Sequence, residues 1–158
     1  PNTVDECTDG NFGNYLAQQS VESIQVENLD NSNIYGQPVF FKGDLVRVTM
    51  TIWCGQLSDQ LVIAYMGDTA NANWVQEART YCYGTQQAYY NLTTTFNLDN
   101  KIGYHVIRGI AGDSTNLGTY CATGNFDDND DVVINVISEP RGTGSPMFLK
   151  NAAVVIDR

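Results

Sequence analysis

The sequence predicts an all-β fold, an antiparallel β-sandwich of about seven strands, and three observations carry this prediction. Apolar and polar residues alternate over several segments, residues that favour turns separate these segments, and helical periodicity is weak. The chain has 158 residues, the length of one domain, and its 42% of hydrophobic residues can form a core. Short alternating strands within one domain are typical of a sandwich.

The clearest strand is 45–53, in which the four apolar residues at even positions share one face and Arg47, Thr49 and Thr51 share the other. The segment 61–66 is continuously apolar, which predicts a central strand. The other expected strands are 21–27, 38–41, 75–83 on an edge, 88–98, 104–111 and 132–138.

The chain divides into an N-terminal arm (1–20), the sandwich (21–138), and a linker with a C-terminal strand segment (139–158). The Gly- and Pro-rich stretch 139–146 breaks the strand pattern. The segment after it is either one more strand of the same sandwich or a strand for the open sheet edge of another subunit. The N-terminal arm has fewer apolar residues for the second role. The residues of the candidate assembly strand are Met147, Phe148, Leu149, Ala152, Val154 and Ile156.

Four cysteines without close spacing predict two disulfides in a secreted protein, rather than a zinc site built from close pairs. Three pairings are possible. We favour Cys54 with Cys82, because each ends a strand-like region, and Cys7 with Cys121, which would attach the N-terminal arm before the last core strand.

The chain carries 18 acidic and 8 basic residues, a formal net charge of -10. This acidity argues against nucleic acid and anionic membranes as partners, since both require clustered Lys and Arg. The apolar runs are far shorter than the roughly 20 residues of a transmembrane helix. The polar start at Pro1 leads us to expect a processed form from which any signal peptide has been removed.

An acidic run precedes the last core strand and has two interpretations. Oxygen-bearing side chains are ligands for calcium, although the spacing is not that of an EF-hand loop. Alternatively, the run is a solvated turn whose charge discourages edge-to-edge aggregation. We expect no required cofactor, and calcium is the one candidate. The residues are Asp127, Asp128, Asn129, Asp130 and Asp131.

Two surface features are candidates for interaction. Asn91 begins the N-glycosylation triplet Asn-Leu-Thr, and alternation places it on the solvent face of its strand. Aromatic side chains near strand ends can stack on sugars or anchor a protein interface, although core packing explains such residues as well. The candidate binding surface consists of Trp74, Tyr81, Tyr83, Tyr89 and Tyr90.

Catalysis has little support in the sequence. The single histidine, His105, lies in a predicted strand, and neither a Gly-x-Ser-x-Gly motif nor a phosphate-binding loop is present. We therefore expect a protein that is not an enzyme.

Three segments show a familiar pattern: Gly43-Asp44-Leu45-Val46-Arg47-Val48, then Gly103-Tyr104-His105-Val106-Ile107-Arg108, then the acidic run before Val132. Together with Asn91-Leu92-Thr93-Thr94-Thr95-Phe96, this order resembles the CARDB-type, immunoglobulin-like domains of bacterial and archaeal surface proteins. The resemblance covers about 21–138 and implies an immunoglobulin-like sandwich at a cell surface. It implies no catalytic residues.

The expected function is that of a secreted structural subunit of a surface filament, pilus-like fibre or layer. Its partners would be copies of itself, joined by packing and by strand addition through the terminal segments. The alternative is a carbohydrate-binding or adhesion module that uses the exposed aromatic residues, with or without calcium.

Overall fold

The computed structural model describes residues 3–10, 16–30, 38–71, 73–83, 87–112 and 120–139, together with the backbone of 153–157. These parts of the chain contain nine strands and no helix. The strands are β1 Ser20–Asn28, β2 Phe40–Phe41, β3 Leu45–Cys54, β4 Gln60–Met66, β5 Val75–Tyr81, β6 Ala88–Asn97, β7 Gly103–Gly112, β8 Asp128–Ile137 and β9 Ala153–Asp157.

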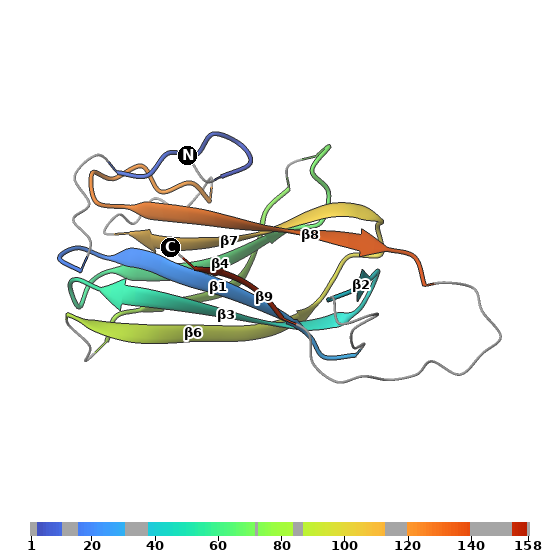
Figure 1. Ribbon diagram of the computed structural model, residues 1–158. Helices are drawn as coiled ribbons and strands as arrows, with labels where there is room; N and C mark the ends of the chain where they lie inside the picture. Colours follow the sequence, from blue (N-terminus) through green and yellow to red (C-terminus); the bar gives the residue numbers. More distant parts are fainter. Residues whose placement is uncertain are drawn as a thin grey trace.

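The strands form two sheets that lie one over the other (Figure 1). The four-stranded sheet has the order β6-β3-β1-β9, and the five-stranded sheet has the order β2-β8-β7-β4-β5. The predicted all-β, two-sheet architecture is therefore confirmed. The expectation of a wholly antiparallel fold is wrong at one place, because the short strand β2 runs parallel to β8. The five-stranded sheet is consequently mixed.

The main core lies between the two sheets. The predicted inner face of β3 is correct, since Val46, Val48, Met50 and Ile52 are all fully buried. These side chains meet Ile63, Ile107, Val132 and other apolar residues of the five-stranded sheet in one continuous cluster. Burial of such side chains stabilises a fold by about 1.5–3 kcal/mol each.

The five-stranded sheet is also covered on its outer face around β4 and β7. A second cluster there contains Val62, Ala64, Ile110 and Ala122, with Trp74 and Tyr120 packed against it. Every residue of β4 is buried as a result. Burial on both faces explains the continuous apolar run, and β4 lies between β7 and β5 as expected of a central strand.

The turn from β2 to β3 explains the Gly43-Asp44 pair of the sequence. Gly43 has a φ of 82°, a left-handed conformation that glycine adopts without strain. The buried carboxylate of Asp44 accepts hydrogen bonds from the backbone N–H of Phe41 at 2.7 Å and from Asn28 Nδ2 at 2.6 Å. The pair therefore closes the turn and ties it to the end of β1.

Two disulfides join the pairs favoured by the sequence. Cys54–Cys82 links the end of β3 to the residue that follows β5, so it connects the two sheets. Cys7–Cys121 links the N-terminal arm to the segment before β8. Disulfides persist in oxidising compartments, and the pair of bridges indicates an extracellular or periplasmic setting.

Candidate functional site

The edge of the four-stranded sheet at β1 and β9 is the first candidate site. Antiparallel pairing aligns Ser23 with Asp157 and Glu27 with Ala153. Along its other side β1 pairs with β3 over nearly its whole length. The C-terminal segment thus lies in the same sandwich here, which is the first of its two interpretations. Met147, Phe148, Leu149 and Ala152 lie outside the described residues, as do the side chains of Val154 and Ile156.

The N-terminal arm is attached to the outer face of the five-stranded sheet through Arg108. This charged side chain is fully buried, and its neighbours along the strand are apolar. Its Nε and Nη2 donate to the two carboxylate oxygens of Asp131 at 2.7 and 2.8 Å. On its other side it donates to Asp5 at 2.5 and 3.3 Å, and Nη1 also donates to the Tyr120 carbonyl at 3.0 Å.

All five N–H groups of the Arg108 guanidinium therefore have an acceptor, which is the condition for burying this charge at a tolerable cost. The Trp74 ring lies over it, 4.4 Å from the guanidinium carbon to the ring centroid. Burial by itself lowers the pKa of Arg108, but the hydrogen bonds to Asp131 and Asp5 raise it above its ordinary value. Every N–H donor of Arg108 is therefore used, and these bonds attach the N-terminal arm to the five-stranded sheet.

Most of the acidic run belongs to strand β8, and the interpretation as a solvated turn is wrong. Asp128 is buried and accepts the Val21 N–H at 2.7 Å. Asn129 is fully buried, accepts the Ala122 N–H at 3.1 Å and donates to two carbonyls. Asp131 pairs with Arg108. The described residues include no group of three His, Cys, Asp or Glu side chains placed to hold a metal ion. Calcium binding at this run stays a prediction.

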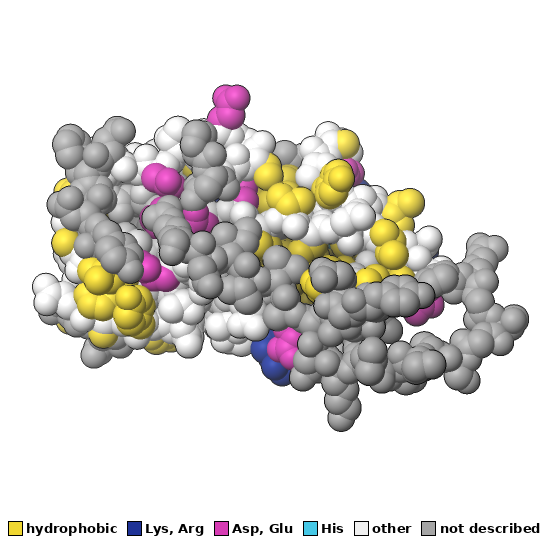
Figure 2. Space-filling view, viewed as in Figure 1, with side chains coloured by type: hydrophobic (Ala, Val, Ile, Leu, Met, Phe, Trp, Pro, Cys, Tyr) yellow, Lys and Arg dark blue, Asp and Glu magenta, His cyan; other side chains and the backbone are white. Residues whose placement is uncertain are grey.

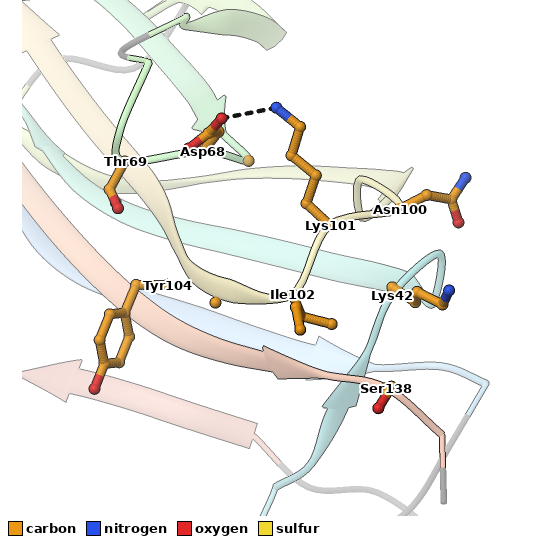
Figure 3. Close-up of a pocket in the computed structure, with 10 residues that line it drawn as sticks. Lys42, Asp68, Thr69, Asn100, Lys101, Ile102, Tyr104 and Ser138 are labelled. Carbon is orange, nitrogen blue, oxygen red and sulfur yellow. Dashed lines mark hydrogen bonds and ion pairs between the residues drawn. The ribbon is translucent and has the colours of Figure 1, made fainter. Parts of the chain in front are cut away.

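An open cleft of about 560 Å³ lies between the start of β7 and the segment after β4 (Figure 3). Lys101 Nζ reaches across it to Asp68 Oδ2 at 2.8 Å, and Asp68 also accepts from the Ala70 N–H and from Asn71 Nδ2. Hydrogen bonding to Asn71 and Lys101 lowers the pKa of Asp68. Both charged groups are solvated, and each is the other's partner. The pair therefore supplies the cleft with no activated acid or nucleophile. Its lining residues are Lys42, Gly67, Asp68, Thr69, Asn100, Lys101, Ile102, Gly103, Tyr104 and Ser138.

His105 is buried on β7, as its strand position suggested. Its Nδ1 lies 2.5 Å from Tyr65 Oη, which accepts the Asp99 N–H at 2.9 Å. Burial lowers the pKa of His105 and raises that of Tyr65, so both side chains are neutral near pH 7. His105 is fully buried, whereas Tyr65 belongs to the main core and also lines a second cleft of about 350 Å³ together with Asp68 and Asp99.

The five predicted surface aromatics do not form one surface. Trp74 covers Arg108, while Tyr90 packs against the main core. The rings of Tyr81 and Tyr83 contact each other at a tilt of 50°, with a centroid distance of 5.3 Å. Tyr89 is exposed and contacts Trp53, which was not in the predicted set, edge to face at 5.1 Å between centroids.

The Trp53–Tyr89 pair lies where β3 ends and β6 begins. A yellow patch is visible at the corresponding left end of the surface in Figure 2. Among the described residues, Trp53 Nε1 and the nearby Gln19 Nε2 are buried donors without a hydrogen-bond partner.

Asn91 lies on the outer face of β6, and its side chain is exposed as a glycan would require. It pairs with Thr51 of β3 across the sheet. Attachment of a glycan there stays a prediction.

The sequence reasoning missed the Arg108 cluster, although a signal was present. Alternation places Arg108 on the same strand face as Val106 and Ile110. A charged residue on an otherwise apolar strand face indicates a buried ion pair. The partners Asp5 and Asp131 are 103 and 23 residues away, so no local pattern identified them.

A comparison of the chain with protein-family models finds no match, and a comparison with curated proteins finds none either. In the part of the chain that the structure describes, no helix is long and apolar enough to span a membrane.

Proposed function

We propose that the chain is a structural subunit of an extracellular filament, pilus-like fibre or layer, and that it assembles with copies of itself by exchange of β9. The observation that carries this proposal is the position of β9. It is hydrogen-bonded to β1 alone, at the edge of the four-stranded sheet. A strand from a second copy would make the same backbone hydrogen bonds to β1.

The reach of the intervening chain is compatible with exchange. Residues 140–152 separate the last described residue after β8 from the start of β9. Thirteen residues span up to about 45 Å when extended. A β9 strand that leaves its own β1 therefore has enough chain to pair with β1 of an adjacent copy.

The N-terminal arm is unsuited to the same role, which narrows the mechanism to the C-terminal strand. Cys7–Cys121 closes the arm covalently onto its own chain, and Asp5 pairs with Arg108. An arm held in this way cannot leave without reduction of the bridge. β9 has no disulfide, because all four cysteines are paired elsewhere.

An immunoglobulin-like fold is part of this proposal, and the strand order supports it. β3 pairs with β6 in one sheet, while β4, β7 and β8 are neighbours in the other. Strands B and E, and strands C, F and G, pair in this way in immunoglobulin domains. The disulfide differs, because Cys54–Cys82 does not connect the strands that would correspond to B and F.

A cross-linking experiment tests the exchange of β9. Gln25 and Val155 are paired across β1 and β9. Protein carrying only Gln25→Cys is mixed with protein carrying only Val155→Cys, refolded together and oxidised at rising concentration. Exchange predicts a disulfide-linked heterodimer, and fibres or layers in electron micrographs of the unmodified protein.

The matched control replaces Gln25→Cys with Arg47→Cys, which lies on β3 and pairs with Glu27 and Thr95 rather than with β9. Exchange of β9 is excluded if the double variant Gln25→Cys/Val155→Cys cross-links only within one chain and the mixed single variants stay at the control level.

A carbohydrate-binding module is the second candidate, and the Trp53–Tyr89 pair favours it. Tyr89 is 55% exposed, and its ring packs edge to face against Trp53 at the end of the sheet. Aromatic rings stack on the apolar faces of sugars. A glycan array followed by calorimetry tests this, with Tyr89→Ala expected to abolish binding and Tyr104→Ala, exposed elsewhere, to preserve it.

A further inference from the structure

The free edge of β6 is the longest regular sheet edge among the described strands. β6 extends over ten residues, Ala88–Asn97, at the end of the four-stranded sheet. It pairs with β3 from Leu45↔Asn97 to Cys54↔Ala88 without a shift in register. On its other side no described strand is hydrogen-bonded to it. The strand therefore presents a straight row of backbone donors and acceptors.

The sequence of β6 lacks the features that normally protect an edge. It contains no charged residue, no proline and no glycine, and it is rich in Thr and aromatic residues, which favour strands. Natural proteins usually protect edges with Lys, Pro, bulges or very short strands.

The other three edges carry such protection. β5 contains Glu77 and Arg79 and a register shift against β4. β2 has only two residues, and β9 carries the charged residue Asp157. β6 is therefore the one described edge that is both long and unprotected.

We propose that β6 pairs antiparallel with β6 of a second copy, so that the two four-stranded sheets become one continuous sheet. In a two-fold symmetric contact each strand faces its own sequence in reverse, and any charge on the strand would lie opposite or near its own like charge. β6 avoids this repulsion because it is uncharged. An uncharged edge also offers nothing to attract a charged peptide, so a second copy fits best.

The outer face of β6 already shows the side-chain contacts that such a pair would repeat. Thr93 hydrogen-bonds to Thr49 of β3 at 3.2 Å, and Thr95 is exposed on the same face. On the inner face, Thr94 Oγ1 donates to the Glu77 carbonyl of β5 at 3.2 Å. This contact is made by a side chain of β6 and shows that β5 packs beside the strand, although the two strands are not paired in one sheet.

This contact differs from the exchange of β9 and does not depend on it. The exchange uses β1 and β9, whereas the proposed dimer uses β6 at the opposite edge of the same sheet. Each copy carries a net charge of -10, so added salt should strengthen the contact by screening the repulsion between copies.

Sedimentation velocity over a range of protein and salt concentrations tests the proposal on protein made without an N-glycan. The unmodified chain should dimerise, and Thr93→Lys/Thr95→Lys should weaken the dimer by about tenfold or more through like-charge repulsion. Thr93→Glu/Thr95→Glu should weaken it more strongly, because it also adds to the net negative charge of each copy. An equimolar mixture of the two variants should restore a heterodimer.

Ser23→Lys/Gln25→Lys is the matched control, since it adds two positive charges to the same outer face but lies on β1. It should leave the dimer intact. Amide hydrogen exchange of the unmodified protein gives a second readout that does not depend on the folding of any variant, and β6 amides should become protected as concentration rises.

The proposal is overturned if the unmodified chain stays monomeric, or if the Lys and Glu variants dimerise as well as the control. It is also overturned if protection on dimerisation appears away from β6. Cross-linking between Gln25→Cys and Val155→Cys proteins reports on β9 separately, so the two proposals can fail independently.

Discussion

Arg108 shows how a single residue connects distant parts of this chain. It is buried within an apolar strand, and its partners come from the N-terminal arm, from β8 and from the segment around Tyr120. A buried charge is tolerated only where its hydrogen-bonding groups are satisfied, because removal from water costs several kcal/mol. The five acceptors and the Trp74 ring meet this requirement.

We predict that Arg108→Ala lowers the free energy of unfolding by about 3–5 kcal/mol, because it leaves Asp131 buried without its counter-charge. The side chain of Asp131 is only 1% exposed. Urea denaturation measures the loss. The control is Arg47→Ala, which removes a solvent-exposed pair with Glu27 and should cost less than about 1 kcal/mol. Equal costs for the two variants would contradict the argument.

His105 is the only histidine of the chain, and its pKa is lowered by burial. An unfolded chain binds this proton near pH 6.5, whereas the folded chain binds it only at lower pH. The unfolded state therefore gains protons first as the pH falls. The contribution of His105 to stability is fully present above about pH 6.5 and is lost as the pH falls through its folded-state pKa.

We predict that the free energy of unfolding decreases below about pH 6.5, with a slope of at most about 1.4 kcal/mol per pH unit from this one proton. Urea denaturation between pH 7.5 and pH 5, in about half-unit steps, measures it. His105→Gln should remove this component. Glu77, whose pKa is raised by burial and by Asp99, contributes with the opposite sign and remains in the variant. An unchanged slope in His105→Gln would refute the assignment.

At the scale of elements, alternation predicted most strands correctly because one face of each is buried and the other is exposed. In β6, Leu92 and Phe96 are buried while Asn91, Thr93 and Thr95 are exposed. β8 was misjudged at its start, since the acidic residues that resembled a turn extend the strand. The side chains of Asp131 and Asp128 accept hydrogen bonds from the backbone N–H groups of Val4 in the N-terminal arm and Val21 in β1, and these partners are remote in sequence.

At the scale of the whole molecule, the two disulfides enclose very different lengths of chain. Cys7–Cys121 spans 114 residues and Cys54–Cys82 spans 28. The entropy of the unfolded chain lost through the bridges corresponds to about 4.8 and about 3.6 kcal/mol of stability, respectively.

We predict that Cys7→Ala/Cys121→Ala lowers the free energy of unfolding by up to about 4.8 kcal/mol and makes residues 3–10 sensitive to protease. The arm would then be held only by noncovalent contacts. Among them are Asp5 on Arg108, the Val4 N–H on Asp131, the Gly10 N–H on the Asp127 carbonyl, and the hydrogen bonds of Asn129 with Thr8 and Asp9. Urea denaturation and limited proteolysis measure both effects. Cys54→Ala/Cys82→Ala should destabilise the protein without exposing the arm. A variant that retains full stability and an uncleaved arm would contradict the prediction.

The sequence by itself determined the all-β class, most strand positions, the buried faces and the favoured cysteine pairs. These properties depend on the period of two along a strand and on residue chemistry, both of which are local. Only the tertiary structure decided which acids meet Arg108, that β2 runs parallel to β8, and that β9 lies beside β1. Each of these depends on which segments become neighbours in space, and alternation along one strand carries no information about its neighbours.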